Sequence, residues 1–157
     1  MSLDRRSSAG SLDRPTVHRA RTWSGEPLGE MCFPNRPESV RMARRFVELA
    51  ADVYGIAHVA ETAALLVSEL ATNATRHARG MDGDAFTVAV SQSGDRIRVE
   101  VRDLDPRLPV MRSFDVLDED GRDLYLVKEL ADRYGAHAVP QGKTVWFELV
   151  AVTEQTS

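Results

Sequence analysis

Residues 86–103, FTVAVSQSGDRIRVEVRD, carry the clearest pattern in the chain. Apolar and polar residues alternate in both halves of this stretch, which is the spacing of two half-buried strands. The Ser93-Gly94-Asp95 sequence between the halves favours a hairpin turn. A hairpin makes an antiparallel pair, so the sequence predicts an antiparallel sheet with one buried face.

Amphipathic helices are predicted on both sides of this hairpin along the chain. Apolar residues recur at intervals of three and four over Glu38–Tyr54 and again over residues 57–78. Gly55 between them is a natural C′ residue for the first helix. A third helix is predicted over residues 122–134, with Gly135 as its C′ residue.

Further strands are predicted at both ends of this region. One lies between residues 21 and 33, with candidate inward residues Trp23, Leu28, Met31 and Phe33. A last hairpin pairs residues 136–139 with 144–150 and turns at Gln141-Gly142. Because the three helices must cover a sheet face, the predicted fold class is α/β, a two-layer sandwich of a mostly antiparallel sheet covered on one face by helices.

The length and composition predict one domain. The chain has 157 residues, of which 43% are hydrophobic, and a net charge of −4. We expect a single domain over residues 21–152, a basic disordered tail over residues 1–20 and a short tail over residues 153–157. The acidic balance argues against a general nucleic-acid binder, since a polyphosphate ligand requires excess positive charge.

Cysteine content and hydropathy narrow the class of protein further. The single cysteine, Cys32, cannot form an internal disulfide and excludes a cysteine-cluster metal site. No apolar run approaches the roughly 20 residues that span a bilayer, and no apolar signal core is present near residue 1. We therefore expect a cytoplasmic protein that binds neither membrane nor, directly, nucleic acid.

The segment ELATNATRHA, residues 69–78, places polar groups beside an apolar helix stripe. Glu69 and Asn73 are four residues apart and therefore share one helix face. Their oxygens are the ligand type that Mg²⁺ takes, and a half-buried carboxylate can act as a general base. The alternative is a boundary pair in which Asn73 caps backbone and Glu69 is solvated. His77 is close to the same stripe, where packed histidines are common.

The segment VRDLDPRLP, residues 101–109, ends the second strand of the hairpin. Strand alternation places Asp103 on the face of Val99 and Val101. If that face is buried, the carboxylate needs a hydrogen-bond donor, such as the exocyclic amine of adenine. The alternative is that the strand ends at Arg102 and Asp103 begins a solvated turn.

Two glycine-containing segments could approach phosphates. Gly121 and Arg122 precede the third predicted helix, where a glycine lets phosphate reach free backbone N–H groups. The GKT sequence at residues 142–144 could add a lysine and a hydroxyl near phosphates. It lacks the upstream glycine spacing of a P-loop, so we do not interpret it as one.

Taken together and in this order, the segments resemble the GHKL ATPase superfamily, and most closely the bacterial anti-sigma-factor serine kinases of partner-switching systems. ELATNATRHA is similar to the N box of that family, and VRDLDPRLP to the box with the adenine-binding aspartate. GRDLYLVKELADRYG resembles the glycine box and its helix, and GKTVWFEL the closing strand. The resemblance covers roughly residues 35–150 and implies a Bergerat-type, histidine-kinase-type ATPase fold that binds ATP with Mg²⁺.

The resemblance implies a role for each matching residue. Asn73 would coordinate Mg²⁺, and Glu69 would be the catalytic base that takes the proton from a protein serine hydroxyl. Asp103 would accept from the adenine amino group, and Thr144 would hydrogen-bond near the base or on the Asp103 side. Residues 104–120 would form a lid. The nucleotide-contacting candidates are Asn73, His77, Asp103, Asp105, Gly121, Arg122, Leu124 and Thr144.

The implied activity is a serine/threonine protein kinase that phosphorylates an antagonist protein, with a sigma factor or an anti-anti-sigma-type protein as partner. Many members of the family are homodimers. Two departures favour another function: Asp105 and Asp123 stand where the family has glycines, and Asp123 places negative charge where a triphosphate docks. The alternative is a non-catalytic binding module that sequesters a sigma factor or another regulatory partner.

Overall fold

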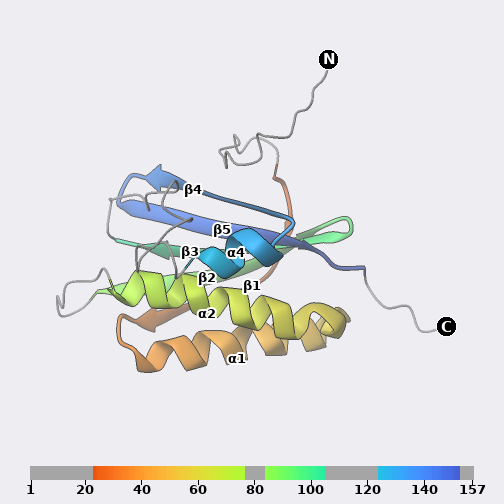
Figure 1. The fold of residues 1–157 in the computed structure, drawn as a ribbon, viewed down its shortest axis with the longest axis horizontal. Helices are drawn as coiled ribbons and strands as arrows, with labels where there is room; N and C mark the ends of the chain where they lie inside the picture. Colours follow the sequence, from red (N-terminus) through yellow and green to blue (C-terminus); the bar gives the residue numbers. More distant parts are fainter. Residues whose placement is uncertain (1–22, 77–83, 105–123, 153–157) are drawn as a thin grey trace, which may run out of the picture.

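A computed structural model describes residues 23–76, 84–104 and 124–152, and these form five strands and the helices that cover them (Figure 1). The elements are, in chain order, β1 (Glu26–Pro34), α1 (Glu38–Val53), the 3₁₀ turn η3 (Ala57–Val59), α2 (Ala60–Arg76), β2 (Ala85–Ser93), β3 (Arg96–Asp103), α4 (Tyr125–Leu130), β4 (Arg133–Val139) and β5 (Gly142–Val150).

The five strands form one sheet in the order β1-β2-β3-β5-β4, and each pair of neighbours is antiparallel. The predicted hairpin of β2 and β3 is confirmed, and Gly94 in its turn has a φ of 62°, which favours glycine. The hairpin of β4 and β5 is also confirmed. Because β5 pairs with β3, the chain returns to the middle of the sheet and leaves β1 and β4 as its edges.

The helices cover one face of this sheet, as predicted (Figure 1). Every second residue of β2, β3 and β5 points into a core shared with α1 and α2. The buried strand residues on this side are Phe86, Val88, Val90, Ile97, Val99, Val101, Val145, Phe147 and Leu149. Alternation thus separates a helix-side face, which holds the core, from an outer face that is rich in charged residues.

The first two predicted helices are present close to their predicted bounds. The hydroxyl of Ser39 donates to the carbonyl of Pro34 at 2.6 Å and ties the start of α1 to the end of β1. Gly55 has a φ of 75° and lies just after the end of α1, as its C′ position predicts. The second helix begins with the 3₁₀ turn η3 and continues as α2.

The third helix is shorter than predicted. It ends at Leu130, and Ala131 already has an extended ψ of 148°. Gly135, predicted as a helix C′ residue, instead lies within β4, opposite Trp146 of β5. A Cβ at Gly135 would come within 2.7 Å of the Trp146 ring, so glycine allows the two strands to pair around a large side chain. Pairing with β5 thus outweighs the helical periodicity of this segment.

The first strand also differs from its prediction. It begins at Glu26, and of the four expected inward residues Phe33 is buried whereas Met31 is 46% exposed. The strand lies at the sheet edge, and its register shifts between Pro27 and Gly29. An edge strand has a neighbour on one side only, so its helix-side residues are less completely covered.

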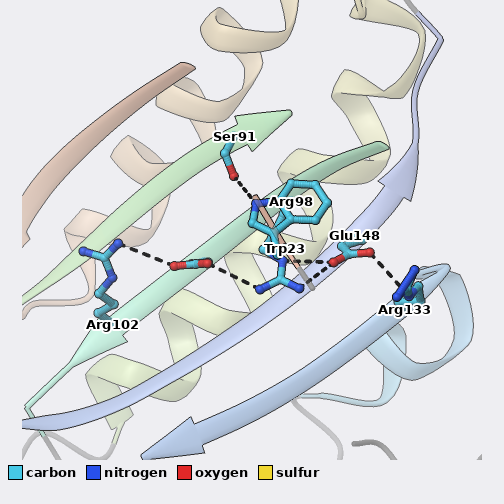
Figure 2. Close-up of polar contacts among 7 residues, drawn as sticks. Trp23, Ser91, Arg98, Arg102, Arg133 and Glu148 are labelled. Atoms are coloured by element: carbon cyan, nitrogen blue, oxygen red, sulfur yellow. Dashed lines mark hydrogen bonds and ion pairs between the residues drawn. The ribbon is translucent and has the colours of Figure 1, made fainter. Parts of the chain in front are cut away.

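Trp23 precedes β1 and lies on the outer face instead of the core (Figure 2). Its ring packs on the guanidinium of Arg98, which lies 4.7 Å from that ring and 3.9 Å from the ring of Trp146. The indole N–H of Trp23 donates to the hydroxyl of Ser91 at 3.0 Å. The outer face therefore contains an arginine stacked between two tryptophans, which anchors the segment before β1.

Within the described residues, no helix combines the length and the apolar character needed to cross a bilayer.

Candidate functional site

Helix α2 places Asn73 and Glu69 at the margin of the core. Asn73 is 3% exposed and Glu69 is half-buried, while Leu66 and Leu70 beside them are fully buried. The buried face of the helix extends from Leu66 and Leu70, away from Asn73, to Ala64, Val67 and Ala71. The amide and the carboxylate therefore lie one turn apart along one edge of the buried stripe, as the spacing predicts.

Asp103 is the last residue of β3 and is buried, at 6% exposure. It follows Val99 and Val101 on the helix-side face, so the strand does not end at Arg102. Of the two alternatives open from the sequence, the structure thus has the buried carboxylate. Such a group must be hydrogen-bonded.

Lys143 provides a partner for the Asp103 carboxylate. The two residues lie directly opposite each other in the β3–β5 ladder. The Lys143 ammonium lies 3.0 Å from Oδ1 and 2.9 Å from Oδ2, and the lysine is 1% exposed. The sequence suggested that this lysine could lie near phosphates; the structure instead pairs it with the carboxylate predicted to bind the base.

Gly142 is needed for this pairing to form. A Cβ on residue 142 would overlap the carbonyl oxygen of Asp103 and would also approach Cα of Leu104. The absence of a side chain therefore lets the start of β5 lie close against the end of β3. That close approach brings Lys143 within reach of the carboxylate.

Thr144, predicted to hydrogen-bond near the base or on the Asp103 side, is not the cross-strand neighbour of Asp103. Thr144 lies opposite Arg102 and His137, one residue beyond the Asp103–Lys143 pair. Because strand side chains alternate, its side chain is on the outer face. The residue beside Asp103 is Lys143, and strand alternation counted from Val145 would have identified it, because Lys143 and Val145 share one face.

Several predicted site residues fall outside the part of the chain that the structure describes. These are His77, Asp105, Gly121 and Arg122, together with most of the expected lid, residues 105–120. Leu124 is described and lies fully buried immediately before α4, within the core cluster.

The described candidates gather at one end of the sandwich. Helix α2 ends at Arg76, and the chain resumes at Asp84 to enter β2, whose first residues pair with the end of β3. Asn73 in the last turn of α2 is therefore at the same end as Asp103 and as Lys143 at the start of β5. Helix α2 also packs against β3, β5 and α4.

The donor set near Asn73 fits one kind of metal site. Within the described residues, no group of three or more His, Cys, Asp or Glu side chains could hold a metal ion by itself. Mg²⁺ is commonly held by one or two protein oxygens together with phosphate oxygens of a substrate. The Asn73 amide oxygen suits that shared mode of binding.

Comparison with known proteins identifies the family. Residues 33–149 match the family described as histidine kinase-like ATPase domain. The chain belongs to this family. The match begins at Phe33, the buried residue of β1, and ends at Leu149 in β5, so it covers both layers of the fold. Membership implies nucleotide binding in general. No curated protein sequence matches the chain.

Solved structures share the fold. The RsbU and RsbW domains of Rv1364c from Mycobacterium tuberculosis are 15% identical, with a TM-score of 0.56 over 82% of this chain. The chain spans 35% of the length of that protein. The histidine kinase domain of a blue-light activated histidine kinase from Erythrobacter litoralis EL346 is 21% identical, with a TM-score of 0.46, over 74% of this chain and 61% of that one. The likeness to the RsbU and RsbW domains shows that the chain shares their fold, in agreement with the family match.

Proposed function

We propose that the chain binds ATP with Mg²⁺ and transfers the γ-phosphoryl group to a serine or threonine hydroxyl of a protein partner. The observation that carries this proposal is the placement of Glu69 and Asn73. A half-buried carboxylate lies one helical turn from a buried amide, at the end of the sandwich that also holds Asp103. These are the groups that a general base and a magnesium ligand require.

Phosphoryl transfer depends on positioning and charge neutralisation more than on covalent help from the protein. Asn73 would hold Mg²⁺, which neutralises phosphate charge when bound. Glu69 would orient the incoming hydroxyl and take its proton. Both side chains lie on one helix that packs against β3 and β5, so their relative positions are fixed by the core.

The partner is proposed from the family resemblance together with the structural likeness to a protein that contains an RsbW domain. We propose a sigma factor, or an antagonist protein that competes for it, as the regulatory partner. The phosphorylated residue would lie on the antagonist. The chain would then act in transcriptional control through a protein complex, without direct contact to nucleic acid.

The test compares two glutamates on the same helix. The full chain is incubated with γ-labelled MgATP and a soluble extract from its own cells, and label on protein is followed together with calorimetric ATP binding. Glu69→Gln should abolish labelling and retain ATP binding. Glu61→Gln, an exposed residue in the first turn of α2, should leave both unchanged. Labelling that persists in Glu69→Gln would reject the assigned base.

A second candidate function is a protein-binding module without phosphoryl transfer. The Lys143–Asp103 ion pair supports it, because the carboxylate predicted to bind adenine already has a cationic partner in this structure. In that case the chain would capture its regulatory partner equally well with and without MgATP. A complex that forms only with MgATP would exclude this candidate.

A further inference from the structure

Lys143 has donors that its surroundings do not use. Its ammonium carries three N–H donors and is 1% exposed. Across the described part of the chain, its polar contacts are the two oxygens of Asp103. A buried cationic donor without an acceptor is costly, so this arrangement suits a site where a ligand supplies one.

The position of this ammonium is fixed by the sheet. Lys143 and Asp103 are cross-strand neighbours in the last pair of the β3–β5 ladder, and Gly142 allows the two strand ends to approach closely. Both side chains lie on the helix-side face. A ligand that reaches the Asp103 carboxylate therefore also meets the Lys143 ammonium.

An acceptor beside a donor selects among purine bases. Adenine presents its 6-amino donor next to the N1 acceptor, which matches a carboxylate beside an ammonium. Guanine presents the O6 acceptor next to the N1–H donor, so in the same orientation both contacts become repulsive. The pair is thus complementary to the Watson–Crick edge of adenine.

We infer that Lys143 is a base-reading residue whose ammonium donates to N1 of adenine while Asp103 accepts from the 6-amino group. This inference rests on the proposed binding of ATP and adds a specificity contact to it. The ion pair then has two roles: it neutralises the buried carboxylate without ligand, and it reads the base when nucleotide is bound.

The experiment is a calorimetric titration of the full chain with MgATP and with the magnesium complex of 1-deaza-ATP, which has CH in place of N1 and keeps the 6-amino group. The wild type should bind 1-deaza-ATP about tenfold or more weakly, because a hydrogen bond from a charged donor is lost. Lys143→Met should bind ATP more weakly than the wild type and should bind the two nucleotides with equal affinity.

The matched control is Arg98→Met, which removes the other buried cation of the same strand pair on the opposite face. It should keep the wild-type ratio of affinities, as judged on protein that is folded by circular dichroism. Equal binding of both nucleotides by the wild type would overturn the inference and leave ATP binding intact. Binding of neither nucleotide would overturn the inference and the proposed function together. If Lys143→Met does not fold, the wild-type ratio alone decides.

Discussion

Arg98 and Glu148 lie opposite each other on β3 and β5, and both Nε and Nη2 of the arginine donate to Oε2 of the glutamate, at 2.9 and 2.6 Å. This pair is on the outer face, where Figure 2 shows Arg98 beside Trp23 and Glu148. The Arg98 guanidinium also packs on the ring of Trp146. The Asp103–Lys143 pair is on the helix-side face of the same two strands. The central strands of the sheet are thus joined by a buried ion pair on each face.

Removing one partner of the outer pair should destabilise the fold strongly. Glu148→Gln removes the carboxylate to which the buried Arg98 guanidinium donates and leaves it, within the described residues, only the longer ion pair with Glu100, at 3.6 Å, so the free energy of unfolding should fall by about 3 kcal/mol. Urea denaturation measures this change. Arg102→Gln removes a more exposed charge from the same face and should cost less than about 1 kcal/mol. Equal losses in the two variants would contradict the role given to the buried pair.

Gly135 should be sensitive to a single added methyl group. In Gly135→Ala the new Cβ would meet the Trp146 ring at 2.7 Å, and moving that ring disturbs its stacking on Arg98. We expect a loss of about 1–3 kcal/mol in the free energy of unfolding. The control is Gly29→Ala, whose Cβ meets the end of the Phe46 ring at 3.3 Å and should be tolerated better. The opposite order would show that β4 and β5 do not pair in this register.

The Trp23 side chain should contribute more to the free energy of unfolding than its hydrogen bond to Ser91 does. Trp23→Ala removes the ring from Arg98 and the donor to Ser91, whereas Ser91→Ala removes the hydrogen bond alone. Trp23→Ala should lower the free energy of unfolding by about 1–2 kcal/mol, and Ser91→Ala by less. Thermal unfolding compares the two. If both cost the same, the ring contact with Arg98 contributes nothing.

The gain in ATP affinity that Mg²⁺ provides should depend on Asn73. If its amide oxygen is a ligand of the ion, Asn73→Ala should reduce the gain in ATP affinity that Mg²⁺ gives over EDTA. Titrations of the variant with and without Mg²⁺ measure this gain. Thr72→Ala, a half-buried neighbour on α2, should keep the full effect of Mg²⁺. An undiminished gain in Asn73→Ala would remove Asn73 from the metal site.

Periodicity predicted most of the fold because burial follows it directly. The alternation around Gly94 and the helical spacing after Pro37 gave the β2–β3 hairpin and α1. The prediction from periodicity failed at the end of the third helix, where a long-range contact outweighed the local preference for helix. Gly135 looks like a helix end, yet its role depends on Trp146, whose position across the ladder no local pattern contains.

For the candidate site too, the sequence predicted local placement but not the partner across the sheet. The spacing of Glu69 and Asn73 fixed their shared helix edge, and alternation placed Asp103 in the sheet. The partner of Asp103 depends on the β3–β5 register, which pairs residues 103 and 143 across a long connection. Thr144 is one residue away from that position, and in a strand one residue changes the face.

The central claim is that an adenine nucleotide binds at the end of the sandwich that holds Asn73, Asp103 and Lys143. Calorimetric titration of the wild-type chain with MgATP and, in parallel, MgGTP tests it most directly. The account predicts saturable binding of MgATP at one site per chain and much weaker binding of MgGTP. A folded chain that releases or absorbs no heat of binding with millimolar MgATP, or that prefers MgGTP, would contradict it.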